Sequence, residues 1–254
     1  MTDRPAPITM GTMTQLSPEI IYQDEHLLAI NKPAGMLSIP DGYQPDLPHV
    51  VQILTPVWGP LWVVHRLDRD TSGILLLARS ADVHRLLNLQ FEDRRIQKTY
   101  RAVVFGVPRW KQITCDLPLR VNGDRRHRTV VDKTGGKPAR TDFIRLHIFR
   151  GASLIEAHPH TGYTHQIRAH LSNLGFPLLG DPLYRFPKGI PEPDHPYLVL
   201  PPIQRTALHA LRVELEHPIT HQPLKLEAPL PQDFSTLLET LRIGPQTEIS
   251  FYNE

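Results

Sequence analysis

Short apolar segments alternate with polar ones along most of the chain, a pattern typical of β-strands. The most apolar run, residues 73–78, predicts a strand buried on both faces. It is far too short to span a membrane. Thr71, Ser72 and Gly73 at its start are residues that favour a turn. Further strands are predicted at 19–22 and 27–30 (a hairpin), 97–105, 112–117, 127–131, 141–149, 152–158, 207–215 and 224–228.

Helical spacing of apolar residues is clearest at 81–92, where Ser80 is the expected N-cap. Shorter helices are predicted near 49–54, after Thr164 as N-cap, and at 234–241. The 26 prolines imply many loops, including a connector at 186–204. These elements predict an α+β fold, with a mixed, largely antiparallel sheet core and flanking helices and loops. We expect one domain at 18–242, a loose leader at 1–17 and a weakly anchored tail at 243–254.

Composition narrows the class of protein only a little. The chain of 254 residues is 40% hydrophobic and 21% charged, as in an ordinary globular domain. Its net charge of +2 does not by itself indicate a nucleic-acid partner. Basic residues do recur in the middle of the chain, Arg125 and Arg126 among them, although such residues often lie on solvated faces. Cys115 is the single cysteine, which excludes an internal disulfide. With no apolar secretory segment at the start, a cytoplasmic protein is expected.

Five charged residues crowd the turn before the apolar run: His65, Arg66, Asp68, Arg69 and Asp70. Charged groups fixed to a central strand suit a catalytic centre. A surface turn whose charges pair with one another would give the same pattern. Spacing alone leaves these two interpretations evenly matched.

The particular residues of this segment favour the catalytic interpretation. HRLD at 65–68, TSG at 71–73 and LLLA at 75–78 together resemble the signature of the RluA-type pseudouridine synthases, which isomerise uridine in RNA. The resemblance implies that Asp68 is the catalytic aspartate and that Arg66 fills the space vacated by a flipped base. Asp70 falls in a variable position and inherits no role. The other signature residues expected at the RNA surface are His65, Thr71, Ser72 and Gly73.

Further segments match the same family in order, over about residues 19–241. Asn31–Met36 resembles its NKPxGM motif, in which Lys32 could face an anion. Residues 98–106 resemble KxYxAxVxG, which implies that Tyr100 stacks on the target base. Residues 161–184 resemble TGRTHQIRxHL…GxPxxGDxxY, which implies that Arg168 pairs with the catalytic aspartate and that His165 and Gln166 bind RNA. Tyr163 departs from the usual arginine, which bears on any RNA contact made there. No S4-type RNA-binding domain is expected before residue 19.

The implied reaction breaks the N1–C1′ bond of uridine and joins C5 to C1′. No atoms are gained or lost, so neither a redox cofactor nor an energy source is needed. A carboxylate such as Asp68, kept ionised beside Arg168, can serve. Attack at C1′ and removal of the 2′ proton both remain open. The base must leave its stack to reach the site. Arg125 and Arg126 would contact phosphates.

Histidines at 158, 160, 165 and 170 raise the alternative of a metal site, but the spacing of 165 and 170 does not match one helix face. We therefore expect no metal and no cofactor. Two other functions stay open. A metal-dependent phosphoesterase could use His65, Asp68 and Asp70, and a non-catalytic RNA-binding protein could keep the basic surface. The expected partner is RNA, a ribosomal or transfer RNA stem-loop, bound by a monomer away from membranes.

Overall fold

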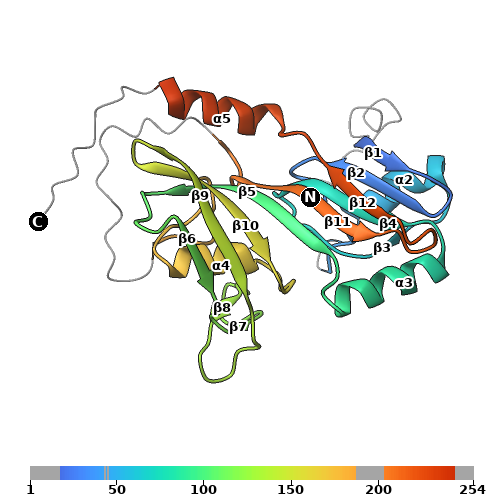
Figure 1. The fold of residues 1–254 in the computed structure, drawn as a ribbon, viewed down its shortest axis with the longest axis horizontal. Helices are drawn as coiled ribbons and strands as arrows, with labels where there is room; N and C mark the ends of the chain where they lie inside the picture. The colour runs from blue at the N-terminus through green and yellow to red at the C-terminus, as the bar shows by residue number, and fades with distance from the viewer. Residues whose placement is uncertain (1–17, 43, 45, 187–202, 244–254) are drawn as a thin grey trace, which may run out of the picture.

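The structure, a computed structural model, describes residues 18–42, 44, 46–186 and 203–243, and in these ranges ten strands form one sheet (Figure 1). Every pairing is antiparallel except that of β4 with β11, which confirms the predicted α+β class. In spatial order the main path is β1 (Glu19–Gln23), β2 (Leu27–Lys32), β4 (Ser72–Ala78), β11 (Leu208–Glu216), β5 (Gln97–Phe105), β10 (Ala152–Pro159), β9 (Thr141–Phe149) and β6 (Gln112–Cys115). β3 (Trp62–Val63) pairs with β4, and β12 (Pro223–Glu227) pairs with β11.

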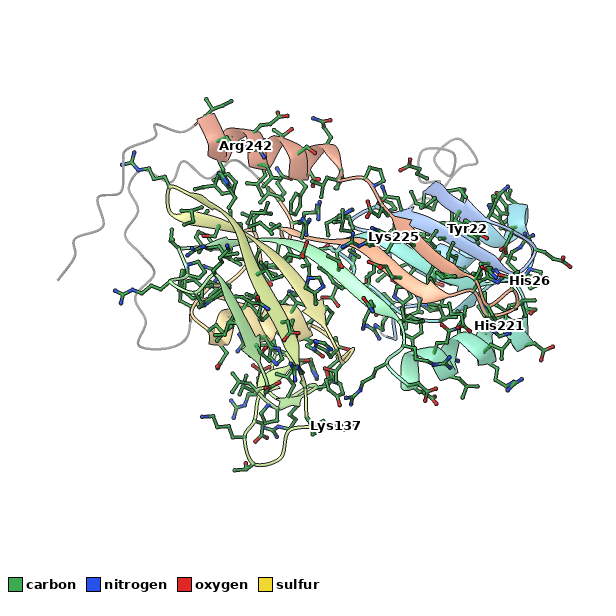
Figure 2. All side chains as sticks on the ribbon, viewed as in Figure 1. Tyr22, His26, Lys137, His221, Lys225 and Arg242 are labelled. Carbon is green, nitrogen blue, oxygen red and sulfur yellow. The ribbon has the colours of Figure 1, made fainter. Side chains whose placement is uncertain are left out.

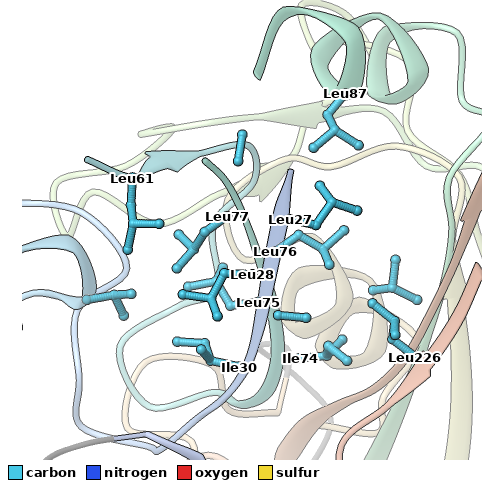
Figure 3. Packing of buried hydrophobic residues seen from close by; sticks show 14 of the residues in the cluster. Leu27, Leu28, Ile30, Leu61, Ile74, Leu75, Leu76, Leu77, Leu87 and Leu226 are labelled. Carbon is cyan, nitrogen blue, oxygen red and sulfur yellow. The ribbon is translucent and has the colours of Figure 1, made fainter. Parts of the chain in front are cut away.

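The predicted central strand is β4, and every one of its residues is buried. It runs between β2 and β11, and its leucines join a large apolar cluster with residues of β2 and β12 (Figure 3). Helix α2 (Val50–Trp58) and helix α3 (Ala81–Glu92) add Leu54 and Leu87 to this cluster. The side chain of Ser80 accepts a hydrogen bond from the amide of Val83, as expected of an N-cap. A continuous apolar core therefore fixes the strand that follows the charged turn.

The start of β4 differs from the prediction, because Ser72 and Gly73 form strand pairs instead of a turn. Gly73 pairs with Ala210 of β11 at φ +115°, and a Cβ atom there would lie 2.2 Å from the carbonyl oxygen of Ala210. Ser72 Oγ lies 2.9 Å from Nδ1 of the buried His209. Glycine is thus required by close strand approach, a contact between distant segments that turn propensity does not register.

The other half of the sheet carries helix α4 (Gln166–Asn173) and helix α5 (Gln232–Ile243). Phe234 and Leu237 of α5 pack with Phe149 and with Val103. α4 begins differently from the prediction: its N-cap is His165 in the left-handed conformation at φ 56°, without a side-chain cap. Thr164 instead accepts a hydrogen bond on its carbonyl oxygen from Thr129. The chain that enters α4 is therefore held by a contact with a distant residue, and the helix begins without a side-chain cap.

A small separate sheet joins β7 (Leu119–Arg120) to β8 (Val130–Val131), at the end of the molecule where Figure 2 labels Lys137. The strands predicted at 112–117 and 127–131 are shorter than expected. Asp124 organises the loop between β7 and β8, because one carboxylate oxygen accepts from the amides of Arg126 and Arg128. Asn122 and Gly123, a pair that often forms a two-residue hairpin turn, therefore lie here in a longer loop. The predicted leader, most of the 186–204 connector and the tail from residue 244 lie outside the described residues.

None of the helices in the described part of the chain has both the length and the apolar composition that a membrane span requires.

Candidate active site

A pocket of about 600 Å³ opens beside the charged turn. Four segments line it: the turn at 64–68 with Thr71, the chain from Phe91 at the end of α3 to Ile96, one face of β5, and the chain at 159–168 that leads into α4; Leu208 of β11 also contributes. These segments come from distant parts of the sequence and meet because β4, β11 and β5 are neighbours in the sheet. The pocket is large enough for a nucleotide-sized ligand.

Asp68 and Arg168 meet in this pocket. Nη1 of Arg168 donates to Oδ2 of Asp68 at 3.0 Å, across 100 residues of sequence. Nε and Nη2 of the same guanidinium donate to Asp181 at 2.7 and 2.8 Å. Burial alone would lower the pKa of Arg168, but the hydrogen bonds and charges of Asp181 and Asp68 outweigh it and raise that pKa. A permanent cation therefore holds the Asp68 carboxylate in place.

Asp181 was not assigned a role from the sequence, although it lies in the matched GD motif. Its side chain is fully buried. Besides the two bonds from Arg168, Oδ1 accepts from the amides of Leu183 and Tyr184 at 2.9 and 3.1 Å. This carboxylate fixes both the arginine and the turn that follows. An aspartate after glycine in a long matched motif was the available signal, but its partner could not be read from the sequence.

Tyr100 lies on β5, with its side chain at the pocket wall. Burial, together with the negative charge of Asp68, raises the pKa of its hydroxyl. The ring therefore remains neutral beside Asp68, which suits an apolar surface for a base.

Two residues of the HRLD motif face the pocket in different ways. His65 accepts a hydrogen bond on Nε2 from the amide of Leu76 at 3.0 Å, and its ring lies 5.2 Å from that of Phe91. Burial, with a smaller contribution from the positive charge of Lys98, lowers the pKa of His65 to about 3. His65 is thus a neutral side chain in the pocket wall, and its hydrogen bond to Leu76 fixes it to β4. Arg66 lies at the pocket and is exposed, so its guanidinium is accessible to RNA.

Lys32 is placed differently from its expected role at an anion. The side chain is fully buried, and Nζ donates to the carbonyl oxygens of Pro33, Met36 and Arg69 at 2.9, 2.9 and 3.1 Å. All three ammonium donors are therefore used inside the protein. Burial lowers the pKa of Lys32 to about 7. A direct phosphate contact by Lys32 is not compatible with this arrangement, which instead fixes the backbone next to Asp68.

Thr71, Ser72 and Gly73 are also buried. Thr71 alone among these three lines the pocket, while Ser72 and Gly73 serve the contact with β11. The expectation that all three border RNA is corrected for Ser72 and Gly73. The matched motif contains both residues that pack inside the protein and residues that line the pocket. The spacing of the motif does not show which residue is which.

Among the pocket residues around the start of α4 are Tyr163, the N-cap residue His165 and Gln166, the first residue of the helix. Nε2 of His165 lies 3.8 Å from Oδ2 of Asp68. Burial lowers the pKa of His165, and the charge of Asp68 opposes this only in part. Gln166 is buried, and its Oε1 accepts from Thr161 Oγ1 at 2.7 Å and from the amide of Tyr163 at 3.2 Å. Gln166 therefore shapes the loop in which Tyr163 replaces the family's usual arginine.

Arg125 and Arg126 are exposed on the loop between β7 and β8 and do not line the pocket. The structure therefore separates them from Asp68, while leaving them accessible to a long RNA. Arg128, in the same loop, makes hydrogen bonds within the protein: it donates to Asp124 and to the carbonyl oxygen of Leu183.

The four histidines at 158–170 do not converge. His158 pairs with Glu156 at 2.8 Å and His160 with Asp142 at 2.7 Å, whereas His170 lies 3.0 Å from Thr141 Oγ1. Across the described ranges, no three His, Cys, Asp or Glu side chains gather in a way that could hold a metal ion.

The pocket joins a carboxylate held by a buried arginine to a neutral aromatic ring, an arrangement typical of an enzyme site. The family model described as RNA pseudouridylate synthase matches residues 26–173, and the chain belongs to this family. It is therefore an RNA pseudouridine synthase, an isomerase, and the phosphoesterase alternative is not favoured.

Relatives and solved structures agree with this assignment. Ribosomal large subunit pseudouridine synthase D of Zymomonas mobilis is 39% identical over 89% of this chain and 73% of its own length. The protein of the same name from Pseudomonas aeruginosa is 40% identical over 88% and 72%. The solved structure of Human RNA Pseudouridylate Synthase Domain Containing 4 superimposes with a TM-score of 0.73 at 26% identity, over 91% of this chain and 96% of that one.

Proposed function

We propose that Asp68 is the catalytic group of this pseudouridine synthase and that its substrate is a uridine in the RNA of the large ribosomal subunit. The observation that carries the catalytic role is the bond of 3.0 Å from Arg168 to Asp68 at the wall of the pocket. The guanidinium orients one carboxylate oxygen. Since Asp181 already neutralises much of the arginine's charge, Asp68 is left available to the substrate.

The chemistry requires an ionised carboxylate in either role. If Asp68 attacks C1′, the N1–C1′ bond electrons leave with the uracil. If Asp68 takes the 2′ proton, the same bond breaks by elimination and the proton is later returned. In both cases C5 then joins C1′, C5 loses its proton and N1 gains one, so the sum of atoms is unchanged. The pocket has to retain the detached uracil while it turns, and the neutral ring of Tyr100 offers a stacking surface.

Base flipping gives Arg66 its proposed role. The target uridine leaves its stack to reach Asp68. Arg66 is the exposed residue next to the catalytic turn, so its side chain can enter the vacated space. Arg125 and Arg126 lie outside the pocket and would contact phosphates farther along the RNA.

Support for a ribosomal substrate comes from the names of the relatives, several of which are ribosomal large subunit pseudouridine synthases. A loop closing a stem suits this pocket, because a loop base is already partly unstacked and costs less to flip. The proposal includes action as a monomer in the cytoplasm, where a reduced Cys115 would persist.

Tritium release from RNA labelled at C5 of uridine tests both parts of the proposal. A large-subunit ribosomal RNA transcript should release tritium with the wild-type protein and none with Asp68→Asn, whereas the RNA affinity of that variant should stay near wild type. Asp70→Asn is the matched control and should stay active. Turnover by Asp68→Asn would refute the catalytic assignment.

The proposed RNA substrate is tested separately, by comparing different RNAs in the same assay. A stem-loop cut from the modified region should suffice, and a duplex of the same sequence should fail. Release from transfer RNA but not from the ribosomal transcript would refute the ribosomal substrate while leaving Asp68 untouched.

A further inference from the structure

Lys98 is a pocket residue to which the reaction scheme gives no task. It lies on β5 two positions before Tyr100, and side chains two apart on a strand share a face. Both residues line the pocket. Thr99, between them, is buried on the opposite face, with Oγ1 3.5 Å from Nδ1 of His158. The strand therefore presents an aromatic ring and an ammonium group side by side to the same ligand.

The Lys98 ammonium has no anionic partner among the described residues. In the described part of the chain, its Nζ has one hydrogen bond, to the carbonyl oxygen of Thr161 at a long 3.4 Å, and no ion pair. Burial lowers the pKa of Lys98 to about 8, so the group is still mostly protonated at pH 7. A partly desolvated cation without a counter-ion costs stability. Such a group is expected where a ligand brings the missing negative charge.

Other cations of the pocket are differently placed. Arg168 is committed to Asp68 and Asp181 through three hydrogen bonds. His65, close enough to sense the charge of Lys98, is neutral. Arg66 and Arg94 also line the pocket but are exposed. Among the described pocket residues, Lys98 is thus the partly buried cation without an ion pair, and it can take an anion from the substrate.

The main chain leaves room above the ammonium group. Gly162 lies beside it, and a Cβ atom added there would be 3.7 Å from Lys98 Nζ, with no other atom within 4 Å. Any side chain at position 162 would therefore cover the ammonium group. The loop itself is held by Gln166, which accepts from Thr161 and Tyr163. The backbone at Gly162 is therefore held in place next to Nζ.

We propose that Lys98 Nζ binds a backbone phosphate of the RNA next to the flipped uridine. This inference rests on the proposed function, which places the uracil on Tyr100 and its sugar at Asp68. The phosphates of that nucleotide are attached to the sugar beside Asp68, and Lys98 lines the same pocket next to the exposed Gly162. The contact would hold the sugar–phosphate backbone while the detached base turns.

Binding measurements test the contact without interference from turnover when every protein also carries Asp68→Asn. The ligand is a synthetic stem-loop centred on the uridine that tritium release identifies. Lys98→Met should make the slope of log affinity against log salt shallower by about 0.7, the value for one phosphate on a single strand. Lys98→Arg should restore the slope. Lys225→Met, at an exposed lysine on β12 that does not line the pocket, is the matched control and should leave the slope unchanged (Figure 2).

Gly162→Ala is an independent probe, because it adds one methyl group over Nζ without a clash and without replacing the lysine. It should weaken binding and reduce the salt slope in the same direction as Lys98→Met. This variant keeps the proposal testable even if Lys98→Met folds poorly.

Neutral methylphosphonates at single positions around the uridine identify the phosphate. At one position, the loss of affinity caused by the neutral group should disappear in Lys98→Met, because both changes remove the same ion pair. Additive losses at every position would overturn the proposal. So would unchanged binding and slope together with a lower kcat for Lys98→Met made in the otherwise wild-type protein, which would assign the charge of Lys98 to the detached base. Tritium release by Asp68→Asn would refute the proposed catalytic role separately, since the phosphate contact is judged from binding alone.

Discussion

Two carboxylates share the guanidinium of Arg168, and replacing each by its amide should separate their tasks. Asp181→Asn should destabilise the fold, whereas Asp68→Asn should remove the chemistry and leave the fold nearly intact. The reason lies in their surroundings. Asp181 is fully buried and accepts hydrogen bonds on both oxygens, while the Asp68 side chain keeps 18% of its exposure and makes one bond to the arginine.

The expected magnitudes follow from these contacts. Breaking a buried ion pair by removing one partner costs about 3–5 kcal/mol. Arg168 would keep its bond to Asp68 in Asp181→Asn, so we expect the lower end, about 3 kcal/mol. For a chain of this size that corresponds to a fall in Tm of about 6–12 °C. Asp68→Asn leaves both bonds to Asp181 in place, so its free energy of unfolding should stay within about 1 kcal/mol of wild type.

Urea unfolding of the three proteins, followed by circular dichroism, measures the difference, and tritium release measures activity on the same preparations. Asp181→Asn should also lose activity, because Arg168 would no longer be held in place for Asp68. Equal stability of Asp181→Asn and wild type would refute this reasoning, as would a larger loss in Asp68→Asn.

Three other outcomes are expected. Gly73→Ala should unfold at clearly lower urea concentration than wild type, because its Cβ would lie 2.2 Å from the carbonyl oxygen of Ala210 at a φ of +115°; an unchanged midpoint would contradict the need for glycine in this strand pair. Arg66→Ala should reduce tritium release more than initial RNA binding, since flipping follows encounter, and equal losses in both assays would argue against the flipping role. Dialysis against EDTA should leave activity intact while the RNA stays folded, and a loss that zinc alone restores would point to a metal-dependent reaction.

Local patterns in the sequence were sufficient to predict elements that depend on contacts between neighbouring residues, and to predict a buried strand from its apolar run. Residues 73–78 predicted the buried strand β4, because a short run of small or apolar residues that begins after turn residues is typical of a strand covered on both faces. Ser80 predicted the start of α3, because an N-cap bonds to an amide three residues on. Asp68 and Arg168 were nominated as a pair through the family resemblance, and the structure brings them to 3.0 Å.

The fold decided what depends on partners far away in the chain. Lys32 looked available to an anion, yet three carbonyl oxygens, one of them 37 residues away, surround its ammonium group. Asp181 and Lys98 carried no distinct signal, since burial against Arg168 and the lack of a counter-ion exist only after β5 and α4 meet beside the turn at 64–68. Strand and helix preferences act over a few residues, whereas the charge balance of a pocket is a sum over segments that only tertiary packing brings together.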